Sequence, residues 1–181
     1  MLKVGIPVLF SEQHWMGGIN YFRSLISAFS LVEQNDIELI IFCEKDGLFN
    51  TTKLNNVRQV IIPELLPRKL SKRIINKVYG VNFELYKAIK NESVDILSHT
   101  QINKRLACKT MWWKPDFQEK YYPEFFNEKD LFLRNQSVVN NALRGYLLFS
   151  SNDAKNDFFK FYNTLPTQNI NVLQFVPEIE I

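Results

Sequence analysis

Apolar residues along the chain alternate between short continuous runs and longer amphipathic stretches. The continuous runs are typical of strands buried on both faces of a sheet, and they predict strands at 4–10, 37–43, 57–62, 94–97, 106–113, 146–150 and 170–176. Between them, apolar residues that recur every three or four positions predict helices over 19–32, most of 67–92, 130–143 and 151–162. Parallel strands need such crossover helices. The pattern therefore predicts an α/β, Rossmann-like doubly wound fold, with a mainly parallel sheet of about seven strands and helices on both faces.

Length and composition fit one compact domain. The chain has 181 residues, of which 46% are hydrophobic, so we predict a single domain over 1–181. Its net charge of +3 is too small to argue for nucleic acid. It has neither a signal peptide nor an apolar run near the roughly 18 residues that span a bilayer, so we expect a soluble, cytoplasmic protein. Cys43 and Cys108 are expected to be free, buried thiols in predicted strands.

Loops at the carboxyl ends of the strands carry the candidate chemistry, because ligands of open parallel sheets bind there. Gly17 and Gly18 are predicted at the point where the loop after the first strand gives way to a helix. Backbone N–H groups and the helix dipole favour an anion such as a phosphate there; the alternative is a plain tight turn. His14 in this loop and His99 after the fourth strand either line a cleft or are structural.

The loop after the fifth strand combines a carboxylate with many aromatic rings. Asp116 follows Pro115 at the expected edge of the sheet. Aromatic surfaces stack on sugar rings or bases, and carboxylates and amides hydrogen-bond their hydroxyls. The alternative is that the aromatic residues only pack the loop onto the domain, namely Phe117, Tyr122, Phe125 and Phe126.

Two further segments have both a functional and a structural interpretation. Ser150 follows the sixth strand, where its hydroxyl either faces the cleft or caps the next helix. A predicted basic amphipathic helix could lie on an anionic membrane or approach a lipid-linked acceptor, or it is an ordinary solvated face. Its basic residues are Arg68, Lys69, Lys72, Arg73 and Lys77.

Three segments, in matching order over nearly the whole chain, resemble the bacterial family-4 type glycosyltransferases. The opening GIPVLFSEQHWMGGINYFRSLISAF resembles the first strand, diglycine loop and helix of that family, and GYLLFSSNDAKNDFFKFY resembles a later strand and serine-initiated helix. Between them, WWKPDFQEKYYPEFFNEKDLFLRNQ resembles a stretch that commonly reads isoleucine-proline-aspartate-phenylalanine-glutamine-histidine, then tyrosine-proline-glutamate-phenylalanine-phenylalanine, then an arginine. The matching residues are Pro115, Asp116, Phe117, Gln118, Tyr122, Pro123, Glu124, Phe125, Phe126 and Arg134.

The resemblance implies one half of a GT-B architecture, in which two Rossmann-like domains face each other across a cleft. This chain would be the N-terminal, acceptor-side domain of a retaining, metal-independent enzyme. Such an enzyme moves a sugar from a nucleotide-sugar donor to a glycan or lipid-linked acceptor, in bacterial surface polysaccharide synthesis. The second domain's glutamate pair and basic residues are not found, so we expect the donor-binding domain to be absent from the chain and the isolated chain to be inactive. Peripheral contact with the inner face of the cell membrane is compatible with a lipid-linked acceptor.

The resemblance also assigns roles to single residues. Asp116 would bind sugar hydroxyls or assist the transfer, and Gly17 and Gly18 would face the donor phosphate and the transferred sugar. Together with the expected positions of the loops, these roles give Gly17, Gly18, His14, Gln118 and Ser150 as substrate-binding candidates. A histidine common near the aspartate in relatives has no counterpart, since the neighbours here are Lys114 and Glu119. Neither a cofactor nor a metal is implied.

Two other function classes stay open on the sequence. The chain could be a non-catalytic binding or regulatory module that kept a Rossmann-like fold. A flavodoxin-like or other nucleotide-binding enzyme would need a phosphate loop or a GxGxxG fingerprint, and the sequence has neither.

Overall fold

The structure is a computed structural model that describes residues 1–9, 16–31, 36–45, 49, 51, 54–63, 65, 76, 81–165 and 169–174. These residues belong to two compact units. The first unit holds the described part of 1–98 together with 103–109, and the second holds 99–102 and the described part of 110–174.

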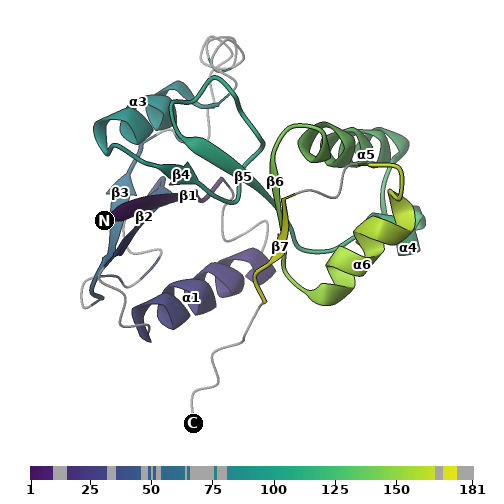
Figure 1. Cartoon of the computed structure of the whole chain (residues 1–181), viewed down its shortest axis with the longest axis horizontal. Coiled ribbons are helices and arrows are strands. Elements are labelled where there is room, and N and C mark those ends of the chain that lie inside the picture. The colour runs from purple at the N-terminus through teal and green to yellow at the C-terminus, as the bar shows by residue number, and fades with distance from the viewer. Residues whose placement is uncertain are drawn as a thin grey trace. The chain divides into compact units, whose positions relative to one another are not determined.

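The first unit is a parallel sheet with a helix on each face. Its strands lie in the order β3-β2-β1-β4, and each neighbouring pair is parallel. Figure 1 shows α1 and α3 on opposite sides of these strands. The elements are β1 (Leu2–Pro7), α1 (Met16–Leu31), β2 (Ile37–Cys43), β3 (Val57–Ile61), α3 (Phe83–Asn91) and β4 (Ile96–Leu97).

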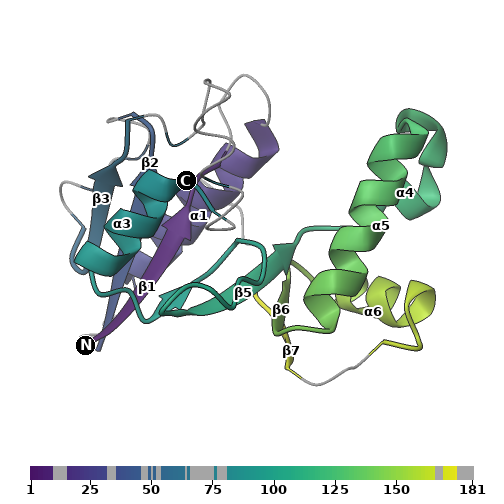
Figure 2. The same cartoon turned by 90° about the horizontal axis from the view of Figure 1, so that it is seen from above.

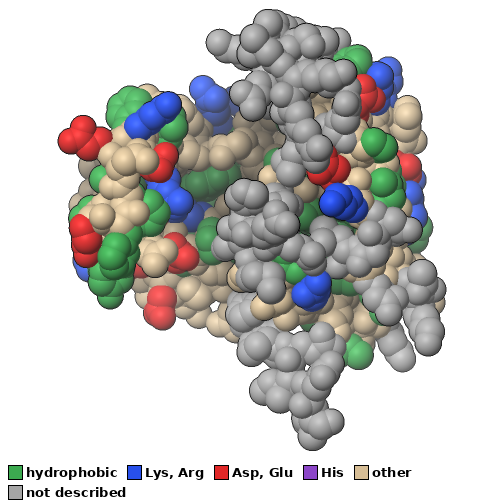
Figure 3. Space-filling view, turned by 180° about the vertical axis from the view of Figure 1, so that it is seen from behind, with side chains coloured by type: hydrophobic (Ala, Val, Ile, Leu, Met, Phe, Trp, Pro, Cys, Tyr) green, Lys and Arg blue, Asp and Glu red, His purple; other side chains and the backbone are tan. Residues whose placement is uncertain are grey.

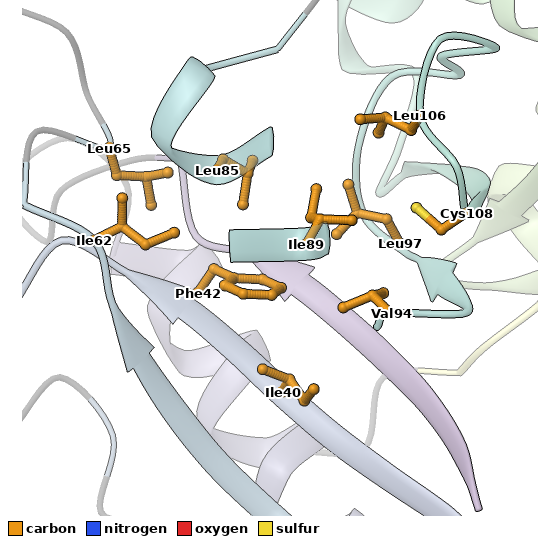
Figure 4. Close-up of a cluster of buried hydrophobic side chains, with 10 residues drawn as sticks. All are labelled: Ile40, Phe42, Ile62, Leu65, Leu85, Ile89, Val94, Leu97, Leu106 and Cys108. Atoms are coloured by element: carbon orange, nitrogen blue, oxygen red, sulfur yellow. The ribbon is translucent and has the colours of Figure 1, made fainter. Parts of the chain in front are cut away.

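Strand β2 is buried on both faces, which explains its unbroken apolar run. Ile40 and Phe42 point to the side of α3, where they pack with Leu85 and Ile89 (Figure 4). The residue between them, Ile41, is fully buried as well. Because successive side chains of a strand point to opposite faces, each face of the sheet receives its own apolar layer.

Gly5 in β1 lies where the sheet and the α3 layer leave no room for a side chain. A Cβ atom there would stand 2.8 Å from Cε2 of Phe42 and 3.0 Å from Cδ1 of Leu97. We expect Gly5→Ala to lower the free energy of unfolding by about 1–3 kcal/mol, since the crowded core must shift. Chemical denaturation measures this. Gly145→Ala is the matched control with a smaller expected loss, because the three atoms nearest to its Cβ all belong to the one side chain of Ile102, whereas a Cβ at position 5 would meet three different side chains. Equal stability of Gly5→Ala and the wild type would contradict the packing described.

The second unit is a three-stranded parallel sheet in the order β5-β6-β7. Trp112, Leu147 and Phe149 of the strands pack in one cluster with Val138 of α5 and Phe158 of α6. Figures 1 and 2 show both helices beside the three strands. The elements are β5 (Lys109–Lys114), α4 (Gln118–Tyr121), the 3-10 helix η1 (Pro123–Phe125), α5 (Glu128–Ala142), β6 (Tyr146–Phe149), α6 (Asn152–Phe161) and β7 (Ile170–Val172).

The predicted fold class is confirmed. The structure is α/β, with seven strands among the described residues, parallel pairing within each unit and flanking helices, consistent with a Rossmann-like doubly wound fold. Cys43 and Cys108 are free and buried, as predicted, although Cys108 precedes β5 instead of lying in it. The basic residues of the predicted basic helix all lie outside the described residues.

Several boundaries differ from the prediction, and two of them differ for a clear physical reason. Gly17 and Gly18 lie inside α1, which begins at Met16, and not in the loop before it. The predicted strand at 106–113 is instead β5 at Lys109–Lys114. Leu106 and Cys108 lie in a bend before β5, and their side chains pack into the core of the first unit on the side of α3. Because both residues are apolar and buried, the sequence pattern there looked like that of a strand.

The described surface carries both signs of charge. Figure 3 shows acidic and basic side chains interspersed over one face of the molecule, in keeping with the small net charge of +3. Among the described helices, none has the length and apolar character that crossing a membrane requires.

Candidate functional site

The turn after β5 presents the predicted catalytic carboxylate to solvent. Asp116 is exposed, and its Oδ1 accepts a hydrogen bond of 3.1 Å from the backbone N–H of Gln118, the first residue of α4. Gln118 is exposed too. This local bond orients the Asp116 side chain relative to the backbone of the turn.

Two contacts fix this turn on either side of Asp116. The hydroxyl of Ser150, which follows β6, donates a hydrogen bond to the carbonyl of Pro115. The ring of Phe117 is 1% exposed and lies 6.1 Å, between centroids, from the ring of Phe149. The hydrogen bond of Ser150 therefore connects the carboxyl ends of the neighbouring strands β5 and β6. The adjacent Ser151 caps α6, because its hydroxyl accepts a 3.0 Å hydrogen bond from the N–H of Ala154.

The aromatic residues of this loop divide into two groups. Phe117 packs into the core, as the structural interpretation predicted. That interpretation is wrong for Tyr122 and Phe125, which are 52% and 71% exposed. Their rings stack on each other with centroids 5.9 Å apart, so they form an apolar surface open to solvent.

Below the exposed turn lies a buried ion pair that the sequence pattern did not predict. Nζ of Lys114 is 2.8 Å from Oε1 of Glu119, and the two side chains are 8% and 3% exposed. Nη1 of Arg134 lies 3.6 Å from the other oxygen, Oε2. Desolvation lowers the pKa of Lys114, and the carboxylate of Glu119 opposes that shift. One feature of the sequence could have indicated this pair. Alternate side chains of a strand point to the same face, and Lys114 is on the same, buried face of β5 as Thr110 and Trp112.

His99 is a partly buried imidazole and not an exposed group. It lies two residues after β4 in the left-handed region (φ 59°), and its ring centroid is 5.1 Å from that of Trp113. Desolvation lowers the pKa of His99 to about 3, so the ring carries no charge at neutral pH. His14, the other histidine, lies outside the described residues.

Gly17 and Gly18 occupy the first turn of α1, Gly17 exposed and Gly18 buried. The first four N–H groups of a helix have no partner within it, and the helix dipole places positive charge there. No acidic residue occupies this turn. An anion site at this helix start stays a prediction.

The structure brings three of the predicted site residues together. Asp116, Gln118 and Ser150 meet at the carboxyl ends of β5 and β6 in the second unit. Gly17 and Gly18 belong to the first unit. A site shared by the two groups stays a prediction.

Comparison with known proteins does not assign the chain to a family. No protein-family model matches it, and no curated protein matches it significantly. Within the described ranges, no three His, Cys, Asp or Glu residues gather closely enough to hold a metal ion. The function is therefore inferred from the residues and their placement.

Proposed function

We propose that this chain provides the acceptor-side domain of a retaining glycosyltransferase, which moves a sugar from a nucleotide-sugar to a glycan or lipid-linked acceptor without a metal. The observation that carries the proposal is the exposed carboxylate of Asp116, on a turn fixed at the carboxyl ends of β5 and β6. This is the edge at which open parallel sheets bind their ligands.

The chemistry of the turn suits a polyhydroxylated acceptor. Of the two acidic residues between Lys114 and Pro123, Glu119 is held in a buried ion pair, so Asp116 supplies the exposed carboxylate. It accepts hydrogen bonds from sugar hydroxyls, and the exposed amide of Gln118 can both donate and accept. The stacked rings of Tyr122 and Phe125 offer an apolar surface for the C–H face of a sugar.

The first turn of α1 has a separate role in the proposal. Sugar transfer breaks the bond between the anomeric carbon and the donor diphosphate, and negative charge then builds on the departing phosphate oxygen. The N–H groups around Gly17 and Gly18 stabilise that charge without reorganising. The partly buried, neutral His99 does not act as a cationic acid at neutral pH. Donor binding needs a second domain, in this polypeptide or in a partner.

Binding to an array of glycans tests the acceptor role. We expect the wild-type chain to bind a subset of glycans and Asp116→Asn to bind the same glycans about tenfold or more weakly, because a charged acceptor of hydrogen bonds is lost. Thermal stability should change little, since Asp116 is exposed. Asp36→Asn, at an exposed aspartate beside the amino end of β2, is the matched control and should bind normally. Unchanged binding by Asp116→Asn, or no glycan bound by the wild type, would overturn the proposal.

A further inference from the structure

The turn that carries Asp116 leaves β5 and enters α4, and an ion pair joins the two ends of this segment. Nζ of Lys114, the last residue of β5, lies 2.8 Å from Oε1 of Glu119, the second residue of α4. Both of these side chains are buried, whereas Asp116, which lies between them in the sequence, is exposed. A buried contact therefore connects the two sides of the segment that presents the proposed acceptor-binding carboxylate.

Helix α4 depends on contacts outside itself. It has only four residues, so its own hydrogen bonds do not hold it in place. Its N-cap residue, Phe117, packs its ring into the core but has no side-chain oxygen to cap the helix. Glu119 supplies a second anchor, because its carboxylate meets Lys114 of β5 and lies 3.6 Å from Nη1 of Arg134 in α5. The carboxylate thus links α4 to the strand before it and to the helix after it.

The position of α4 determines the orientation of the Asp116 side chain. Oδ1 of Asp116 accepts its hydrogen bond from the N–H of Gln118, the first residue of α4. An exposed carboxylate without this bond would sample several rotamers, and ligand binding would then have to immobilise it. The contacts run from the ion pair through α4 and the N–H of Gln118 to Asp116. A shift of α4 would therefore release the carboxylate.

The same ion pair is poorly suited to stabilising the fold. Removing two charges from water is costly, and their attraction repays the cost only where further hydrogen bonds satisfy the remaining polar atoms. Within the described part of the chain, neither carboxylate oxygen of Glu119 has a hydrogen bond of good geometry. Uncharged side chains of similar size would fill this space about as stably. The presence of the pair is explained if it fixes the conformation of the turn.

We infer that Lys114 and Glu119 are positioning residues for the acceptor: their ion pair holds the start of α4 and thereby keeps the Asp116 carboxylate in one orientation. The inference rests on the proposed function and adds to it two residues that do not touch the acceptor. Asp116 binds the acceptor hydroxyls, and the ion pair reduces the conformational entropy that its side chain loses on binding.

The charge-free double variant Lys114→Met/Glu119→Gln tests the inference by calorimetric titration with the glycan selected on the array. We expect most of the wild-type stability but a glycan affinity about three- to tenfold lower, because the Asp116 carboxylate is no longer ordered in advance. Val138→Ala is the matched control, since it removes a fully buried side chain of α5 from the core of the same unit. It should lose stability and keep the wild-type affinity.

A thermodynamic cycle with Asp116→Ala shows whether the ion pair acts through Asp116. In the Asp116→Ala background, the double change should lower the affinity by about twofold or less, because no carboxylate is left to orient. Equal losses in the two backgrounds, wild-type affinity in the double variant, the same loss of affinity in Val138→Ala, or a double variant that does not fold would overturn the inference and leave the proposed function standing. No glycan bound by the wild type would overturn both.

Discussion

Replacing Glu119 by glutamine should lower the free energy of unfolding by about 3–5 kcal/mol, because it leaves the ammonium group of Lys114 buried without its counter-charge. Lys114 is 8% exposed and 2.8 Å from the carboxylate that the variant removes. Urea denaturation at pH 7 measures the loss. The deficit should shrink as pH rises, because desolvation already lowers the pKa of Lys114 and the neutral amine costs less to bury.

The double variant Lys114→Met/Glu119→Gln tests whether the loss in Glu119→Gln comes from the unpaired charge of Lys114. It removes both charges and keeps two side chains of similar length, so we expect it to recover most of the stability that Glu119→Gln loses. Arg134 also loses its partner in this variant, but it is 46% exposed, so water solvates its charge and no buried cation is left behind. A double variant as unstable as Glu119→Gln would show that the pair does not act as a unit.

Acidification should destabilise the protein through His99. Its pKa is about 3 in the folded state and about 6.5 in the unfolded state, so the unfolded chain binds more protons between those values. Stability from this group is therefore complete above about pH 6.5 and is lost as pH falls toward 3. The upper limit of the loss is about 5 kcal/mol, from 1.36 kcal/mol for each unit of difference in pKa.

The variant His99→Asn isolates this contribution. Asparagine tolerates the left-handed backbone conformation that His99 adopts, and it does not titrate. The free energy of unfolding should fall less steeply from pH 6.5 to pH 4 in His99→Asn than in the wild type. Parallel curves for the two proteins would contradict the burial of a neutral imidazole against Trp113.

The sequence was most informative where burial and local capping decide the structure. Strand β2 has the predicted bounds because all seven of its residues are at least half-buried and five are fully buried. The start of α6 was predicted from its polar opening, and Ser151 indeed caps it. The N-terminal turn of α1 was missed, since two glycines disfavour a helix by about 1 kcal/mol each. Buried Ile19 and Phe22 anchor that turn through tertiary packing, which outweighs the intrinsic preference.

The candidate site was only partly predictable for a related reason. Asp116 was singled out because it follows a strand and a proline, and both features are local. The partnership of Lys114 and Glu119 depends on α4, a helix of four residues, which is too short to leave a periodic pattern. The Ser150 contact with Pro115 joins residues 35 positions apart, which no local pattern shows.

Isothermal titration of the chain with the acceptor and with the donors of the proposed reaction tests the central claim most directly. The glycan selected on the array serves as the acceptor, and UDP-glucose, UDP-N-acetylglucosamine and GDP-mannose serve as donors. An acceptor-side domain should give saturable heat with the glycan and weak or no binding of the nucleotide-sugars. Tight binding of a nucleotide-sugar by this chain, with no heat from the glycan, would contradict the account.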